Sequence, residues 1–302
     1  MSGWKKYPVY AIGYLSFFVA FFLVSLYLTF DANALGPVIE KNLAGLPALK
    51  GKDVTITKVS LYRVLGLEFR GVQISERIKP GEEAAPPLSI DRLSVTPRLS
   101  SLPGLFSALS KGKPPTIALS HFAVLMGGGK VEGELTSSPT ELLLEAKIKN
   151  PIDLEKIALP LGKFKGAKFK GKLSGQTDLD LRDLAKPATW NGIIELELAK
   201  PEIKSLLILD DLSMERCTTR LKIEANTVKI ETFKLQGEML PVNLQGSLIL
   251  KSPFRTSLLD VKGSVVQSEL FKTKNPMASG LLPNLKDFSQ KGPIEQLAPG
   301  VF

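Results

Sequence analysis

The sequence predicts a mainly β protein: an N-terminal transmembrane helix followed by a curved antiparallel β-sheet, either an open trough or an incomplete barrel, with a few short helices. Three observations support this fold class. A long uncharged apolar segment lies near the start, most later segments alternate between apolar and polar residues, and glycine recurs inside the alternating segments. A long apolar run is typical of a membrane-spanning helix, and period-two alternation is typical of strands with one buried face.

The uncharged segment extends from Val9 to Phe30. At about 1.5 Å per residue, a helix over it is about 33 Å long, enough to cross a hydrocarbon core of about 30 Å. Lys5 and Lys6 precede the segment, so the positive-inside rule leaves the N-terminus in the cytoplasm and exports the rest. The predicted membrane-anchor residues in this segment are Val9, Phe17, Phe22 and Phe30.

A cleaved signal peptide is the alternative, because Ala32-Asn33-Ala34 has the small residues of a cleavage site after Ala34. Signal peptides usually contain only about 7–15 apolar residues, so the length favours a retained anchor. Both interpretations export the remainder. The expected organisation is a cytoplasmic N-terminus at 1–8, a transmembrane helix at 9–30, a juxtamembrane helix and linker at 31–50, a β-rich domain at 51–268 and an irregular tail at 269–302.

Residues 34–46 carry apolar side chains at helical spacing, which predicts a short helix after the anchor. From Val54 onward the period is two, as in Ile194-Glu-Leu-Glu-Leu198, so each strand has one buried and one solvent-facing side. Such strands are commonest in antiparallel sheets. Further short helices or turns are expected at 102–109, 127–129, 152–158, 182–185 and 285–288.

Glycine recurs in the pattern apolar-x-Gly-x-apolar, centred on Gly133, Gly171, Gly246 and Gly263. A glycine inside a strand usually marks curvature, a bulge or close backbone approach, so the pattern favours a bent sheet over a chance recurrence. Two early segments also change phase, at residues 56–59 and 69–72. A one-residue slip exchanges the two faces of a strand unless a bulge absorbs it, so bulges or strand ends are expected there.

Composition argues against an enzyme. The chain has one histidine, His121, and one cysteine, Cys217, so neither an internal disulfide nor a zinc site of the usual ligands is expected. No nucleophile motif accompanies His121. Residues 166–172 have the spacing of a phosphate-binding loop, but Leu173 stands where the loop needs a Mg²⁺-binding Ser or Thr. No catalytic residue, metal ligand or cofactor is therefore predicted.

The chain is basic, with a formal net charge of +9, and its densest basic stretch contains interleaved phenylalanines. Such a surface can bind single-stranded nucleic acid, but an exported domain does not meet it, so no nucleic-acid partner is expected. A solvated strand face is favoured, with contact to anionic lipid or an acidic partner as the alternative. The candidate basic contact face comprises Lys163, Lys165, Lys168, Lys170 and Lys172.

The order of elements over residues 9–125 resembles a known family. The apolar span is followed by Val54-Thr-Ile-Thr-Lys-Val-Ser-Leu61, Gly66-Leu-Glu-Phe-Arg-Gly-Val-Gln-Ile74, Ile90-Asp-Arg-Leu-Ser-Val95 and Ile117-Ala-Leu119. This order resembles the start of AsmA-like proteins and, within that group, the inner-membrane protein N of type II secretion systems. The later glycine-containing strands agree with it more loosely.

The resemblance implies a single-pass bacterial inner-membrane protein with a periplasmic domain. It implies a non-enzymatic accessory component of the type II protein secretion system, anchored in the lipid bilayer and docking to other secretion-system subunits. The alternative is an AsmA-like protein that binds or transfers phospholipid in an apolar groove. A continuous apolar groove would favour the lipid function, and a closed sandwich core would favour docking.

Overall fold

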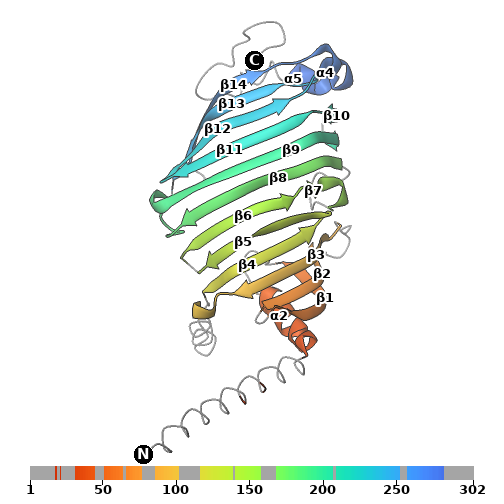
Figure 1. Cartoon of the computed structure of the whole chain (residues 1–302). Coiled ribbons are helices and arrows are strands. Elements are labelled where there is room, and N and C mark those ends of the chain that lie inside the picture. The colour runs from red at the N-terminus through yellow and green to blue at the C-terminus, as the bar shows by residue number, and fades with distance from the viewer. Residues whose placement is uncertain are drawn as a thin grey trace, which may run out of the picture.

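The computed structural model describes residues 31–44, 51–63, 66–76, 86–101, 116–138, 140–157, 168–206, 209–251 and 257–281, together with Phe18 and Phe21. These residues form one 14-stranded sheet with a few short helices (Figure 1). The predicted mainly β fold, with an open and curved antiparallel sheet, is confirmed.

The strands follow one another across the sheet in the order of the chain. They are β1 (Lys52–Tyr62), β2 (Gly66–Glu76), β3 (Leu88–Pro97), β4 (Ile117–Met126), β5 (Gly129–Ser137), β6 (Leu142–Asn150), β7 (Ile152–Asp153), β8 (Lys168–Leu181), β9 (Trp190–Leu206), β10 (Leu209–Ser213), β11 (Arg216–Glu224), β12 (Thr227–Gln236), β13 (Val242–Ile249) and β14 (Leu258–Val265). Neighbouring strands are antiparallel throughout. Only the short β7 and β10 leave this path, pairing with β8 and β9.

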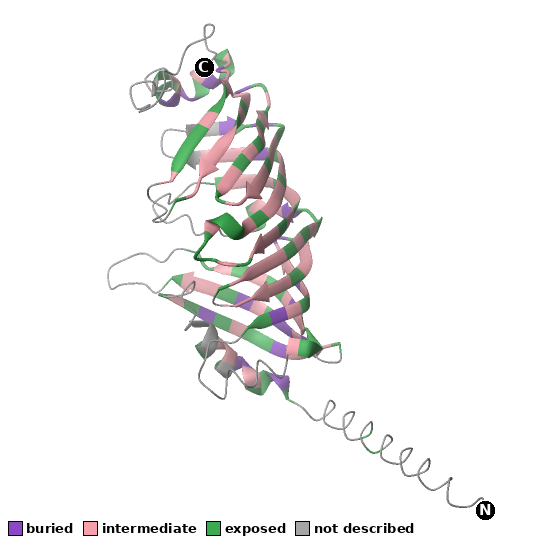
Figure 2. Ribbon diagram, turned by 90° about the vertical axis from the view of Figure 1, so that its left-hand side faces the viewer, coloured by how far each residue is buried: buried purple, intermediate pink, exposed green. Residues whose placement is uncertain are grey.

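The α-helices lie at the two ends of the sheet, and short 3-10 turns also occur between its strands. The helical elements are η1 (Ala32–Leu35), α2 (Gly36–Ala44), η3 (Leu99–Ser101), η4 (Leu154–Lys156), η5 (Pro187–Thr189), α4 (Glu269–Lys274) and α5 (Pro276–Leu281). Figure 2 shows α2 near one end and α4 and α5 near the other, on the same side of the sheet. The short helix predicted after the anchor is therefore present, as α2.

The tail prediction is wrong for residues 269–281, which form α4 and α5 instead of an irregular segment. Ser268 begins α4, because its Oγ accepts a hydrogen bond from the Phe271 backbone N–H at 3.1 Å. Each helix has only six residues, too few for a helical period to show in the sequence. The turn predicted at 127–129 joins β4 to β5. In the segment predicted as a turn at 152–158, the described residues form the short strand β7 followed by the 3-10 turn η4.

The segments expected at 1–8, 102–109 and 285–288 lie outside the described residues, as do the anchor residues Val9, Phe17, Phe22 and Phe30. Phe18 and Phe21, from the predicted span, are helical and exposed. Within the described ranges, no helix combines the length and the apolar character needed to cross a membrane.

The two predicted phase slips occur together. β1 and β2 pair Ile56 with Val72 and then Lys58 with Arg70 in one unchanged register, while Thr57 and Gly71 between them form no bridge. Gly71 has a positive φ of 61°, and the Thr57 hydroxyl donates a hydrogen bond to its carbonyl at 3.2 Å. Because both strands slip at the same place, their apolar faces stay aligned on either side of it.

Gly133, within β5, shows why glycine recurs inside the strands. A Cβ at this position would lie 2.0 Å from the carbonyl oxygen of Glu145 on β6. A Cβ at Gly246 would lie 2.1 Å from the carbonyl oxygen of Asp260, and a Cβ at Gly263 would lie 1.9 Å from that of Asn243. The absent side chains therefore allow neighbouring backbones to approach closely, as expected where a sheet bends.

Replacing Gly133 with alanine is expected to destabilise the protein by about 1–3 kcal/mol, because the added methyl group forces β5 and β6 apart. Urea unfolding of the full-length protein in detergent, followed by circular dichroism, measures this change. Gly36→Ala is the matched control, since a Cβ there meets only Val59 Cγ2 at an ordinary 3.6 Å. Equal unfolding midpoints for the two variants would contradict this account of the strand glycines.

Candidate functional site

One face of the sheet is apolar from strand to strand, because the register places apolar residues opposite each other. One row crosses the sheet from β4 to β14: Leu119, Leu135, Leu144, Leu179, Gly192, Ile223, Val228, Leu248 and Leu259. A parallel row contains Phe122, Gly133, Ala146, Thr177, Ile194, Leu221, Ile230, Gly246 and Val261. Two adjacent rows of this kind make a continuous apolar surface.

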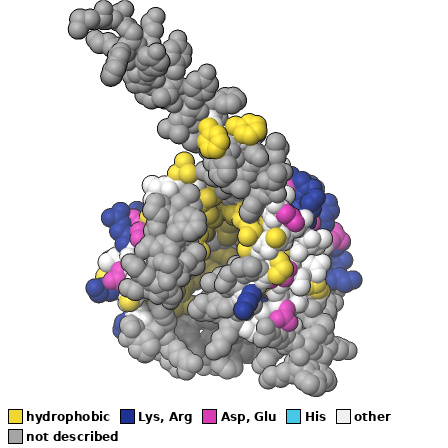
Figure 3. Space-filling view, turned by 90° about the horizontal axis from the view of Figure 1, so that it is seen from below, with side chains coloured by type: hydrophobic (Ala, Val, Ile, Leu, Met, Phe, Trp, Pro, Cys, Tyr) yellow, Lys and Arg dark blue, Asp and Glu magenta, His cyan; other side chains and the backbone are white. Residues whose placement is uncertain are grey.

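This apolar face is the concave one. Viewed along the sheet from the β1 end, hydrophobic side chains line a hollow and charged side chains lie around the outside (Figure 3). On β9, Glu195 and Glu197 alternate with apolar neighbours and pair with arginines of β11, Arg220 at 3.3 Å and Arg216 at 3.1 Å. The outer face is thus polar, with ion pairs between its side chains, while the inner face is lined by apolar side chains.

At the β1 end, the concave face is covered. Ala32 of η1 joins a buried cluster with Val54, Val59, Phe69 and Val72, all from β1 and β2. The amphipathic α2 packs here as well, through Ile39. This end therefore has an ordinary hydrophobic core between a helix and a sheet.

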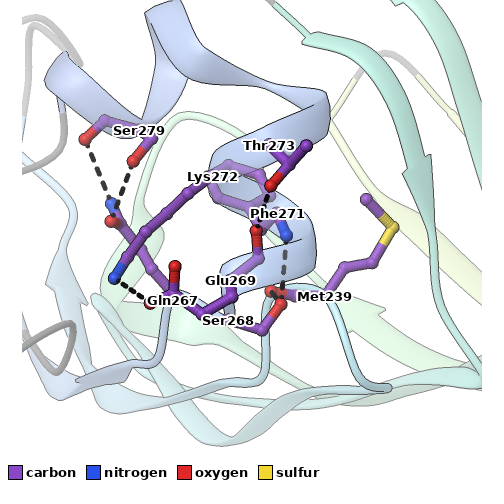
Figure 4. A network of polar contacts seen from close by, with 8 residues as sticks. All are labelled: Met239, Gln267, Ser268, Glu269, Phe271, Lys272, Thr273 and Ser279. Atoms are coloured by element: carbon purple, nitrogen blue, oxygen red, sulfur yellow. Dashed lines mark hydrogen bonds and ion pairs between the residues drawn. The ribbon is translucent and has the colours of Figure 1, made fainter.

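At the β14 end, α4 and α5 form a second cover. Phe271 of α4 is only 1% exposed and packs with Leu212, Met214, Met239 and Ala278. Polar contacts fasten the cover to the sheet (Figure 4). The Ser268 hydroxyl donates to the Met239 carbonyl at 2.9 Å, and Gln267 Nε2 donates to the Ser279 carbonyl at 3.3 Å.

Between these two covers the apolar face is open in the part of the chain that the structure describes. On β5, β6, β8 and β11–β13 no apolar side chain is fully buried, and both buried clusters lie at the ends. Leu196, in the middle of β9, is 40% exposed. We call this concave surface from β4 to β13, formed by the two rows above and by Leu196 next to them on β9, the trough.

The trough has the character of a binding site for apolar ligands. Monomeric soluble proteins rarely expose contiguous apolar surfaces of more than a few hundred square ångströms, and larger ones usually mark sites for partners, membranes or ligands. The row from Leu119 to Leu248 joins eight strands on the main path, and seven spacings of about 4.8 Å span about 34 Å. That length matches the hydrocarbon core of a bilayer, about 30 Å, and so exceeds a single leaflet.

The predicted basic contact face is only partly described. Lys168, Lys170 and Lys172 lie on β8, whereas Lys163 and Lys165 lie outside the described residues. Lys170 Nζ is 2.9 Å from Glu155 Oε1, and the hydrogen bond and charge of that carboxylate raise the pKa of the lysine. Lys170 is therefore occupied by an internal ion pair.

His121 and Cys217 do not lie together. His121 is on β4 opposite Thr96, and Cys217 is on β11, opposite Leu198 and Leu235 of the apolar face. Burial raises the pKa of the Cys217 thiol, which keeps it protonated and weakly reactive. Among the described residues no group of three or more His, Cys, Asp or Glu side chains could hold a metal ion.

The outer face also carries a depression of about 610 Å³ beneath His121 and Glu145. Glu195 in its lining is engaged by two neighbours: Gln176 Nε2 donates to Glu195 Oε2 at 2.7 Å, and Arg220 Nε is 3.3 Å from Glu195 Oε1. Glu145 and Asp178 are direct cross-strand neighbours, so both carboxylates point to the same side. Glycosidase chemistry requires two carboxyls facing each other across a substrate, which this arrangement does not provide.

Fold and site together define a class: an open antiparallel sheet with one continuous apolar concave face and a short helical cover at each end. A comparison of the chain with known protein families, with characterised proteins and with solved structures finds no match in any of the three.

Proposed function

We propose that this protein holds acyl chains of membrane lipids in the trough, as a non-enzymatic lipid-binding or lipid-transfer protein. The observation that carries the proposal is the apolar surface that the described residues leave uncovered between the two helical covers, including the exposed Leu196. When an acyl chain lies on this surface, apolar atoms of both the acyl chain and the protein are removed from contact with water. Each methylene so buried contributes about 0.8 kcal/mol.

The proposal includes the location of the protein. Residues 9–30 would anchor it in the bacterial inner membrane, with the N-terminus in the cytoplasm and the sheet in the periplasm. A reporter enzyme fused to Phe302 should be active only in a periplasmic assay, and activity in the cytosol would refute this orientation.

The direct test is to purify the full-length protein in a mild detergent and to identify bound lipid by native mass spectrometry. We expect phospholipid to remain bound at about one or more molecules per chain, and a fluorescent fatty acid to compete with it. His121→Ala and Cys217→Ala should retain lipid as the wild type does. A lipid-free protein that also fails to bind the fluorescent fatty acid would refute the function.

A second candidate is the accessory role in type II secretion that the resemblance of residues 9–125 implies. The observation that favours it is the edge strand β14, since a sheet edge can accept a strand from another protein. Affinity capture of the detergent-solubilised protein should then recover secretion-system subunits. Recovery that survives removal of lipid would favour docking over lipid binding.

A further inference from the structure

The two edges of the sheet differ in how their backbone groups are satisfied. On β1, the outward N–H groups of Ile56 and Val59 donate to side chains, Glu40 Oε1 at 2.6 Å and Asn33 Oδ1 at 2.9 Å. Both acceptors come from the helical cover at that end. Such capping prevents another strand from pairing with β1.

β14 carries no equivalent cap among the described residues, where it pairs only with β13. The Val266 N–H donates to the Pro241 carbonyl at 2.9 Å, and backbone groups alternate in direction along an antiparallel strand. Leu259, Val261 and Gly263 therefore direct their N–H and C=O groups away from β13. Leu259 is 65% exposed, more than any other leucine whose burial is described.

We propose that β14 pairs with β14 of a second copy of this chain, antiparallel and centred on Val261, so that the two sheets join into one. In this register Val261 lies opposite Val261 of the second copy. Each of the outward-directed residues then forms backbone hydrogen bonds with its counterpart, which removes the unpaired edge.

Charge complementarity favours this register. Asp260 falls directly opposite Lys262 of the second copy, and twofold symmetry repeats the pair. These residues form a non-hydrogen-bonded pair, the kind in which the side chains are closest, with Cα atoms about 4.5 Å apart. Opposite charges directly across a strand pair stabilise it, whereas like charges destabilise it.

Shape complementarity favours the same register. Leu259 falls opposite Gly263 of the second copy, and Gly263 already lies opposite Leu244 within its own sheet. The sheet contains this arrangement elsewhere: Gly246 lies between Ile230 on one neighbouring strand and Val261 on the other. Gly263 would thus acquire a large apolar neighbour on each side, and the exposed Leu259 would acquire a partner.

The joined sheet has a defined geometry. Direct cross-strand partners point to the same face, so the two apolar faces become one continuous surface. Because α2 lies at the opposite end of the sheet from β14, the two copies place their first helices at the far ends of the assembly. The inference is independent of the lipid function, since it depends only on the edge strand.

Cysteine cross-linking of the full-length protein in lipid nanodiscs and in detergent tests the register. In a Cys217→Ser background, Val261→Cys should form a disulfide-linked dimer under mild oxidation, because Cα atoms of a hydrogen-bonded pair are about 5.5 Å apart. Lys262→Cys is the matched control, since its diagonal counterpart is about 7–8 Å away and too far for a disulfide. Equal cross-linking of the two variants, or none by Val261→Cys, would overturn the proposal.

Charge exchange supplies a second test that does not depend on thiols. Asp260→Lys and Lys262→Asp should each weaken dimerisation by about tenfold or more, because each places two like-charged pairs across the interface. The double variant, Asp260→Lys with Lys262→Asp, should restore wild-type association. Lys234→Asp on β12 should leave it unchanged. Sedimentation of a monomer at all concentrations, or a double variant as weak as the single ones, would exclude this pairing.

Discussion

Replacing Leu196 with aspartate is expected to reduce lipid retention by the trough at least about tenfold while leaving the sheet folded. Leu196 is 40% exposed on the concave face, with Gly175 and Thr219 as its cross-strand neighbours. A carboxylate there removes apolar contact with about three methylenes, about 2–3 kcal/mol, and must also stay hydrated. Aspartate is too short to lift its charge out of the trough, as a lysine would.

Native mass spectrometry and titration with a fluorescent fatty acid measure the loss. Ile193→Asp is the matched control: it makes the same chemical change on the same strand but on the outer face, opposite Asp178 and Lys222. This variant should bind lipid like the wild type. If both variants lose lipid equally, the effect comes from the sheet's stability, and if neither does, the trough is not the binding surface.

Replacing Phe271 with alanine is expected to give the largest loss of stability of any single change at the β14 end, about 3–5 kcal/mol. The side chain is 1% exposed and lies at the centre of the cluster with Leu212, Met214 and Met239. The cavity left behind would be enclosed by α4 and the ends of the strands. The neighbouring Leu270→Ala should cost little, because Leu270 is 43% exposed.

Hydrogen exchange measured by mass spectrometry shows which strands lose stability in Phe271→Ala. In a sheet whose strands mostly contact only their neighbours, stability is largely a sum of local terms. Exchange in Phe271→Ala should therefore accelerate in β10 and β12–β14, with little change in β1–β3. Uniform acceleration over all strands would contradict this local behaviour and indicate a single cooperative unit.

The sequence predicts the two faces of each strand well, because alternation is a local property. Ile194-Glu-Leu-Glu-Leu198 lies in β9 as expected, with Glu195 and Glu197 ion-paired on the outer face. The slips in phase predicted the irregular pair of Thr57 and Gly71. Strand-interior glycines predicted close backbone approach, which Gly133 shows.

The cover at the β14 end could not be read from the sequence in the same way. α4 and α5 are too short to show a helical period, and prolines in the segment favour irregular structure. The one local signal is Ser268, an N-cap residue followed by Leu270 and Phe271. Nothing local indicates that Phe271 packs against Leu212 and Met214, because that contact joins segments more than fifty residues apart in the chain.

Sequence alone determined that this protein is built from strands with one apolar and one charged side, since a period of two depends only on adjacent residues. Tertiary structure decided that the apolar sides form an open concave surface, which the described residues cover at both ends and leave uncovered between them. The reason is that curvature, closure and helix placement depend on many strand pairs and on contacts between residues distant in sequence. No short segment determines them, so only the assembled sheet distinguishes a trough from a closed core.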